Sequence, residues 1–207
     1  MKHDMSAKIR ALKNGGARRD PDLPEMPKGH FYPDHYTLGV DLSEVGHIKV
    51  RPVREDDAPL LEELFCSLTP HSVYLRFFSF LRQLPPRMLE RFSRIDYRKE
   101  VALIALRKEN GQEKMVGDAR VVETSEPGMA EFSVMVTDPL QGKGIGACLL
   151  THCLAIARHK GYRRIYGIVL PENKQMLALG RKLGFEIKRI PGSSEYELSK
   201  DMDRDEK

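Results

Sequence analysis

Residues 131–146 read EFSVMVTDPLQGKGIG, and the architecture of the chain follows from this run. Residues 131–136 predict a strand, and Ile145, Leu149, Cys153 and Ile156 recur at the spacing of a helix over residues 144–158. Gly142, Gly144 and Gly146 cost backbone entropy at the helix start, where a plain tight turn would need only one glycine. Successive N–H groups at the positive end of a helix dipole suit a pyrophosphate, and Lys143 adds a positive charge. The run therefore predicts an anion-binding loop between a strand and a helix.

The same loop also satisfies the dinucleotide-binding pattern G-x-G-x-x-A through Gly142, Gly144 and Ala147. That pattern normally ends the first strand of a fold with several further strand–helix units, and only about 60 residues follow it here. The acidic residue expected about 20 positions later at a strand end is also missing, since Glu172 comes after Pro171. The context argues against NAD(P) as the ligand.

Outward from this run, the pattern predicts a single α/β domain with a mixed sheet. Further helices are expected to begin at Asp56–Asp57 and to cover 73–78, 86–95 and 172–183. Strands are expected over 36–41, 47–53, 101–107, 114–123, 164–170, 185–190 and 195–198, with a hairpin turn at Asn110–Gly111.

Composition limits the class of protein. The longest apolar run is Val101 to Leu106, so no membrane span is expected. Residues 1–20 carry the whole net charge of +4, so a flexible basic tail over 1–30 is expected ahead of a domain over 31–200 and an acidic tail over 201–207. Because the rest of the chain is neutral, nucleic acid is not an expected partner. The 3 cysteines lack the spacing of a metal site, and their odd number does not suit a set of disulfides. Neither a metal site nor a disulfide framework is therefore expected, and a cytoplasmic location fits.

With these residues in view, the chain resembles the GNAT superfamily of N-acetyltransferases. Gln141–Gly146 matches its Q/R-x-x-G-x-G/A loop, and Pro171-Glu172-Asn173 followed by Leu183-Gly184-Phe185-Glu186 matches its closing segment. The likeness is greatest to the bacterial protein-lysine acetyltransferase domains associated with acyl-CoA synthetases. It covers about residues 45–200 and includes RPVREDD at 51–57, SVYLRFF at 72–78, AEFSV at 130–134 and Tyr166-Gly167.

The resemblance implies a single GNAT-like domain whose mixed, mostly antiparallel sheet opens beside the 131–136 strand to hold acetyl-CoA. It implies cofactor contacts from the residues Met135, Val136, Gln141, Gly142, Lys143, Gly144, Ile145, Gly146 and Asn173. Unpaired backbone groups of Met135 and Val136 are expected to orient the thioester and to stabilise the oxyanion. Glu131 is expected to be the general base. No general acid is evident, because Phe185 stands where many relatives have tyrosine, and Tyr196 is a weak substitute.

These expectations make the chain an acetyl-CoA-dependent N-acetyltransferase that works by direct attack of an amine on the thioester, without a metal. By resemblance the acceptor is a lysine side chain of a protein such as an acyl-CoA synthetase. Two alternatives stay open: the same chemistry on a small amine, and a non-catalytic acyl-CoA-binding module that regulates a partner.

Overall fold

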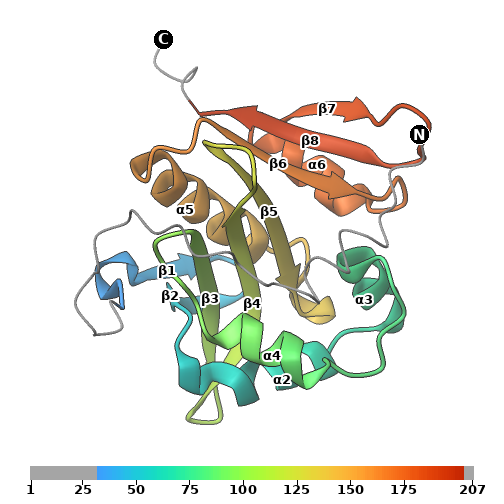
Figure 1. Ribbon diagram of the computed structural model, residues 1–207. Helices are drawn as coiled ribbons and strands as arrows, with labels where there is room; N and C mark the ends of the chain where they lie inside the picture. The colour runs from blue at the N-terminus through green and yellow to red at the C-terminus, as the bar shows by residue number, and fades with distance from the viewer. Residues whose placement is uncertain (1–31, 203–207) are drawn as a thin grey trace.

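The computed structural model describes residues 32–202 of the 207-residue chain (Figure 1). The expected tail over 1–30 lies outside the described residues. At the other end, the last strand runs through Asp201, and Met202 is buried, so the folded part extends past the expected boundary at residue 200.

One sheet of 8 strands forms the centre of the domain, in the order β1-β2-β3-β4-β5-β6-β8-β7. Among the strands of residues 32–202, β5 and β6 are the only parallel neighbours, and every other adjacent pair is antiparallel. The expected mixed, mostly antiparallel sheet is therefore confirmed. The strands are β1 (Leu38–Leu42), β2 (Gly46–Pro52), β3 (Glu100–Glu109), β4 (Gln112–Glu123), β5 (Met129–Val136), β6 (Arg164–Val169), β7 (Glu186–Arg189) and β8 (Tyr196–Asp201).

The sequence signals place most of these elements correctly. Asn110 and Gly111 have φ of 52° and 83°, the positive values that a two-residue type I′ hairpin turn requires, and they join β3 to β4 as expected. β3 and β4 are longer than predicted, because each continues to this turn with charged residues that periodicity alone assigns to a loop.

Helices cover both faces of the sheet. They are α2 (Ala58–Cys66), α3 (Pro70–Phe77), α4 (Pro86–Ser93), α5 (Ile145–His159) and α6 (Lys174–Lys182). One apolar cluster joins α5 to the sheet through Ile145, Leu149 and Cys153, and a second cluster on the opposite face joins α2, α3 and α4. Within residues 32–202, no helix has the length and apolar character to cross a membrane.

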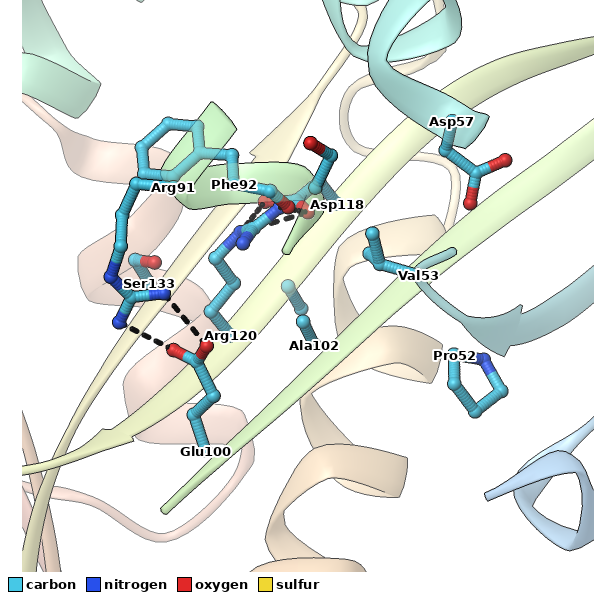
Figure 2. A network of polar contacts seen from close by, with 12 residues as sticks. Pro52, Val53, Asp57, Arg91, Phe92, Glu100, Ala102, Asp118, Arg120 and Ser133 are labelled. Carbon is cyan, nitrogen blue, oxygen red and sulfur yellow. Dashed lines mark hydrogen bonds and ion pairs between the residues drawn. The ribbon is translucent and has the colours of Figure 1, made fainter. Parts of the chain in front are cut away.

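The face covered by α2, α3 and α4 also contains buried ion pairs, which Figure 2 shows in part. Arg51 donates two hydrogen bonds to Asp57, of 2.7 and 2.6 Å, and Arg120 of β4 donates three to Asp118, with Phe92 under its guanidinium. Arg91 of α4 reaches Glu100 at the start of β3. Because a buried charge needs a partner, these pairs fix how the first helices sit on the sheet.

Candidate active site

The two parallel strands at the centre of the sheet separate part-way along their length. β5 and β6 pair only at Met129↔Arg164, Ala130↔Ile165 and Glu131↔Tyr166. Beyond that point β5 continues beside β4, whereas β6 continues beside β8, and Figure 1 shows the two strands diverging toward α3. The expected opening in the sheet is present, and Glu131 stands at the last pair before it.

A bulky side chain lies at the base of this opening on the α5 face. The ring of Phe132 covers Gly167 of β6 so closely that a Cβ added to Gly167 would lie 2.7 Å from Phe132 Cε1. The Phe132 ring also packs on Phe185, with centroids 5.0 Å apart. Phe185 is therefore a core residue here, in line with the absence of the family's tyrosine at that position.

The backbone of β5 offers different groups to the opening from those expected. The N–H of Thr124 donates to the carbonyl of Met129 at 3.0 Å, and that of Thr137 donates to Val116 at 3.1 Å. Because hydrogen-bonded residues alternate along an antiparallel pair, the backbone groups of Met135 point to β4, and those of Val134 and Val136 point to the opening. The backbone groups of Met135 therefore do not face the opening as expected, and those of Val134 do.

The Val136 carbonyl is also engaged. Gln141 Nε2 donates to it at 3.1 Å and to Ser72 Oγ at 3.2 Å. The Gln141 side chain thus positions the loop against β5 and α3. Val136 keeps its N–H directed at the opening, beside the backbone groups of Val134.

The glycine loop has the backbone that an anion site requires. Gly142 and Gly144 have φ of 76° and 96°, and the first hydrogen bond of α5 runs from Cys148 N–H to the Gly144 carbonyl at 2.9 Å. Within the described part of the chain, the N–H groups of residues 142–147 have no acceptor. No side chain caps α5, so these groups and the positive end of its dipole remain available to a ligand.

Asn173 begins α6 and has a local structural role. Its Oδ1 accepts a hydrogen bond from the Met176 N–H at 3.1 Å, so the side-chain oxygen caps the helix. The side-chain amide nitrogen of Asn173 donates to no group among residues 32–202 and is left for the cofactor contact expected of this residue.

Glu131 lies on the face of the sheet covered by α2, α3 and α4. Met135 belongs to the apolar cluster of that face, so alternation along β5 places Glu131 and Ser133 there as well. Glu131 is half-buried, and its carboxylate accepts no hydrogen bond from any residue in the range 32–202. Its lone pairs are therefore available to a substrate or a water molecule.

Two neighbours of Glu131 were not singled out from the sequence. Tyr166, its partner in register, has its pKa raised to about 12 by burial and then by the charge of Glu131. Arg76 of α3 interacts electrostatically with Glu131 and donates from Nη2 to Ser133 Oγ at 2.8 Å. In the sequence, Arg76 stands within the SVYLRFF run at residues 72–78, which is part of the family likeness.

Tyr196 does not approach Glu131. It packs on the apolar cluster of the α5 face, which is the opposite side of the sheet. The weak expectation of Tyr196 as general acid is thus not supported by its position.

The remaining reactive side chains have structural contacts. His152 Nε2 lies 2.7 Å from the Tyr36 carbonyl oxygen, and Cys153 is buried with its Sγ near the Ala119 carbonyl. Cys148 packs against the same cluster. Within residues 32–202, no group of three or more His, Cys, Asp or Glu side chains could hold a metal ion.

Comparison with known proteins decides the family. Residues 61–185 match the family model of the acetyltransferase (GNAT) family. The chain belongs to the GNAT acetyltransferase family.

Relatives of this GNAT chain include an acetyltransferase of Pseudomonas aeruginosa, 32% identical over 161 residues, which cover 78% of this chain and 86% of the relative. Acetyltransferase Pat of Mycolicibacterium smegmatis is 29% identical over 136 residues, or 65% of this chain, and the match spans 40% of that longer protein.

Solved structures of acetyltransferases have the same fold as this chain. The GNAT domain of Streptomyces lividans PAT superposes with a TM-score of 0.75 at 30% identity, covering 82% of this chain and 99% of that domain. The Salmonella typhimurium protein yncA, solved with its cofactor acetyl-CoA, shares the fold with a TM-score of 0.61 at 20% identity, covering 77% of this chain and 96% of that one. The GNAT chain described here is an acetyl-CoA-dependent N-acetyltransferase.

Proposed function

We propose that this GNAT enzyme transfers the acetyl group of acetyl-CoA to lysine side chains of proteins, with Glu131 as the general base. The observation that carries the proposal is the position of Glu131 at the last β5–β6 pair, at the edge of the opening in the sheet. The likeness to Acetyltransferase Pat and to the PAT domain supports a protein acceptor.

In this proposal the N–H groups of residues 142–147 bind the diphosphate of acetyl-CoA, with Lys143 beside them. The backbone of Val134 and the N–H of Val136 hold the pantetheine arm and the thioester carbonyl in the opening. Donors aimed at that carbonyl stabilise the negative charge that develops on its oxygen during attack.

The chemistry requires one proton acceptor. A lysine amine has an ordinary pKa of about 10.4, so at neutral pH it must lose a proton to become a nucleophile. Glu131 accepts this proton, and the amine lone pair then forms the C–N bond as the C–S bond breaks. The nitrogen loses a second proton when the amide forms. The departing thiolate takes up one proton, so the protons balance.

We further propose that the enzyme works in a reducing compartment such as the cytoplasm, where its three unpaired cysteines, Cys66, Cys148 and Cys153, stay reduced. An acyl-CoA synthetase is the acceptor suggested by the resemblance noted from the sequence.

The test is incubation of a cell lysate with acetyl-CoA and the purified chain, followed by mapping of newly acetylated lysines. Glu131→Gln is expected to lower kcat by about 10²- to 10⁴-fold and to leave the affinity for acetyl-CoA unchanged, because it removes the proton acceptor alone. Glu172→Gln, at an exposed position, is the matched control. Unchanged turnover in Glu131→Gln would remove the base from the proposal. CoA release with small amines but no modified proteins would favour a small-molecule acceptor.

A further inference from the structure

Two buried arginine nitrogens in this domain have no hydrogen-bond acceptor. They are Nε of Arg76 on α3 and Nη1 of Arg120 on β4, and within residues 32–202 no other buried side-chain nitrogen or oxygen lacks a partner. Because buried polar groups in folded proteins are hydrogen-bonded in the great majority of cases, this pair indicates an acceptor that the described chain does not itself supply.

The two arginines meet at Ser133 of β5. Ser133 is the partner of Arg120 in the β4–β5 register, so their side chains are neighbours on one face of the sheet. Arg76 Nη2 donates to Ser133 Oγ at 2.8 Å, which brings its guanidinium to the same place. Ser133 comes two residues after Glu131 and so lies beyond the last β5–β6 pair, along the opening.

These two guanidinium groups share one contacting carboxylate. Asp118 accepts three hydrogen bonds from Arg120, and the two residues are 2% and 3% exposed (Figure 2). Within residues 32–202, no carboxylate lies within ion-pair distance of Arg76, whereas Arg51 and Arg91 each have one. The groups in contact at Ser133 therefore carry one positive charge in excess, and a charge shielded from water is costly without a counter-ion.

Part of the Arg76 guanidinium can be reached from outside the folded chain. The residue is half-buried, and its Nη1 has no hydrogen-bond partner among residues 32–202 but is not enclosed as Nε is. A planar guanidinium with free N–H groups on its edges matches the geometry of a carboxylate, and the hydrogen bonds between two such charged groups are strong. The missing acceptor is therefore best supplied by a carboxylate that enters from the opening.

We propose that Arg76 forms a subsite that binds a carboxylate of the acceptor, supplied by an aspartate or glutamate that flanks the lysine to be acetylated. On this face Glu131 meets the acceptor amine in the proposed function, and Ser133, which holds Arg76, lies about 7 Å further along β5. Side chains at positions i and i+2 of an extended peptide have the same spacing. The face thus presents an anion and then a cation to an acceptor that carries an ammonium group and a carboxylate. This subsite rests on the proposed function and specifies its acceptor.

The test compares two peptides that differ only in charge around the lysine. One carries aspartate at the second position on either side of the lysine, and the other carries asparagine at both positions. In initial-rate assays of CoA release by the full chain, we expect the KM of the aspartate peptide to be about tenfold lower, with kcat unchanged. The reason is that the subsite strengthens binding of the acceptor and leaves the chemical step alone.

Variants of Arg76 assign this preference to the guanidinium. Arg76→Met removes the charge and keeps much of the length of the side chain, so the two peptides should then have the same KM, and Arg76→Gln is the second charge-free variant if Arg76→Met does not fold. Arg76→Lys retains the charge and should keep part of the preference. Arg82→Gln removes an exposed arginine from the loop after α3 and, as the matched control, should keep the full preference.

Calorimetry gives a readout that needs no turnover. The same two peptides, with acetyl-lysine in place of lysine, are titrated into the chain loaded with CoA, and the aspartate peptide should bind about tenfold more tightly. Equal affinities overturn the inference, as does a preference that persists in a folded charge-free variant. If the unmodified chain releases no CoA with either lysine peptide and modifies no protein, the proposed function fails, whereas the titration still decides whether Arg76 binds a carboxylate.

Discussion

Single residues in this enzyme have roles set by the neighbour on the next element. Glu131 and Tyr166 are 35 positions apart in the sequence, yet they form the last pair between β5 and β6. Gln141 belongs to the loop motif, but its side chain spans Val136 and Ser72 rather than facing the loop amides. A motif therefore identifies which residues matter, and the pairing of strands determines what each side chain does.

Tyr166 provides a prediction at this scale. Burial raises its pKa to about 12, so transfer of its proton to a thiolate of ordinary pKa near 8.5 is uphill. We therefore expect Tyr166→Phe to lower kcat less than about tenfold, as measured by CoA release from acetyl-CoA with a lysine-bearing acceptor. A loss of a hundredfold or more would instead identify Tyr166 as the missing general acid.

The same residue affects stability at high pH. A pKa that is higher in the folded than in the unfolded state means that the unfolded chain binds fewer protons, so stability falls as the pH rises from about 10 to about 12. Denaturant unfolding of Tyr166→Phe should show a smaller fall over that range, and an unchanged fall would contradict the assigned burial of the phenol.

Hydrogen bonds and close packing contacts hold helices and strands in place around the opening. Asp138, in the short 3₁₀ turn before the glycine loop, accepts hydrogen bonds from the Thr69 N–H at 3.0 Å, Thr69 Oγ1 at 2.9 Å and Ser72 Oγ at 2.6 Å. The start of α3 is thereby tied to the loop that precedes α5. On the other face, a Cβ on Gly180 of α6 would lie 2.4 Å from Leu198 Cδ2, so this glycine allows α6 to approach β8.

A substitution at Gly167 can test whether the close contact with Phe132 constrains β5 and β6. Gly167→Ala would place a Cβ 2.7 Å from the Phe132 ring, and the ring has little freedom to move because it also packs on Phe185. We expect a loss of about 1–3 kcal/mol in the free energy of unfolding by urea, together with weaker binding of acetyl-CoA.

Phe132→Leu in the same chain is the matched control, because a smaller side chain leaves room for the new methyl group. The double variant should recover part of the stability lost in Gly167→Ala. If Gly167→Ala alone is as stable as the unmodified chain, the close contact at the base of the opening does not constrain the strands.

At the scale of the whole molecule, the opening separates two parts of one sheet. Strands β1 to β5 form one part, β6, β8 and β7 form the other, and three residue pairs between β5 and β6 join them. A ligand that binds in the opening contacts both parts, so its binding energy adds to the stability of the whole fold.

Binding of acetyl-CoA should therefore have a global and a local signature. At a concentration 100 times its Kd, acetyl-CoA should stabilise the fold by about 2.7 kcal/mol, seen as a rise in Tm. Hydrogen exchange should slow at the amides of residues 142–147 and of Val134 and Val136, which face no acceptor among residues 32–202. NAD is the control ligand, and protection by NAD alone would reject the assignment of the loop.

The sequence by itself indicated the family, the order of strands and helices along the chain and the position of the glycine loop, because hydrophobic periodicity and glycine placement are local properties of the chain. It also indicated Glu131 through its motif. Tertiary packing determined which backbone groups of β5 face the opening, and it placed Tyr196 on the opposite face from Glu131 and Tyr166 beside it. It likewise left Arg76 without an anion to contact. These features depend on register and on contacts between residues distant in the chain, and no local pattern encodes them.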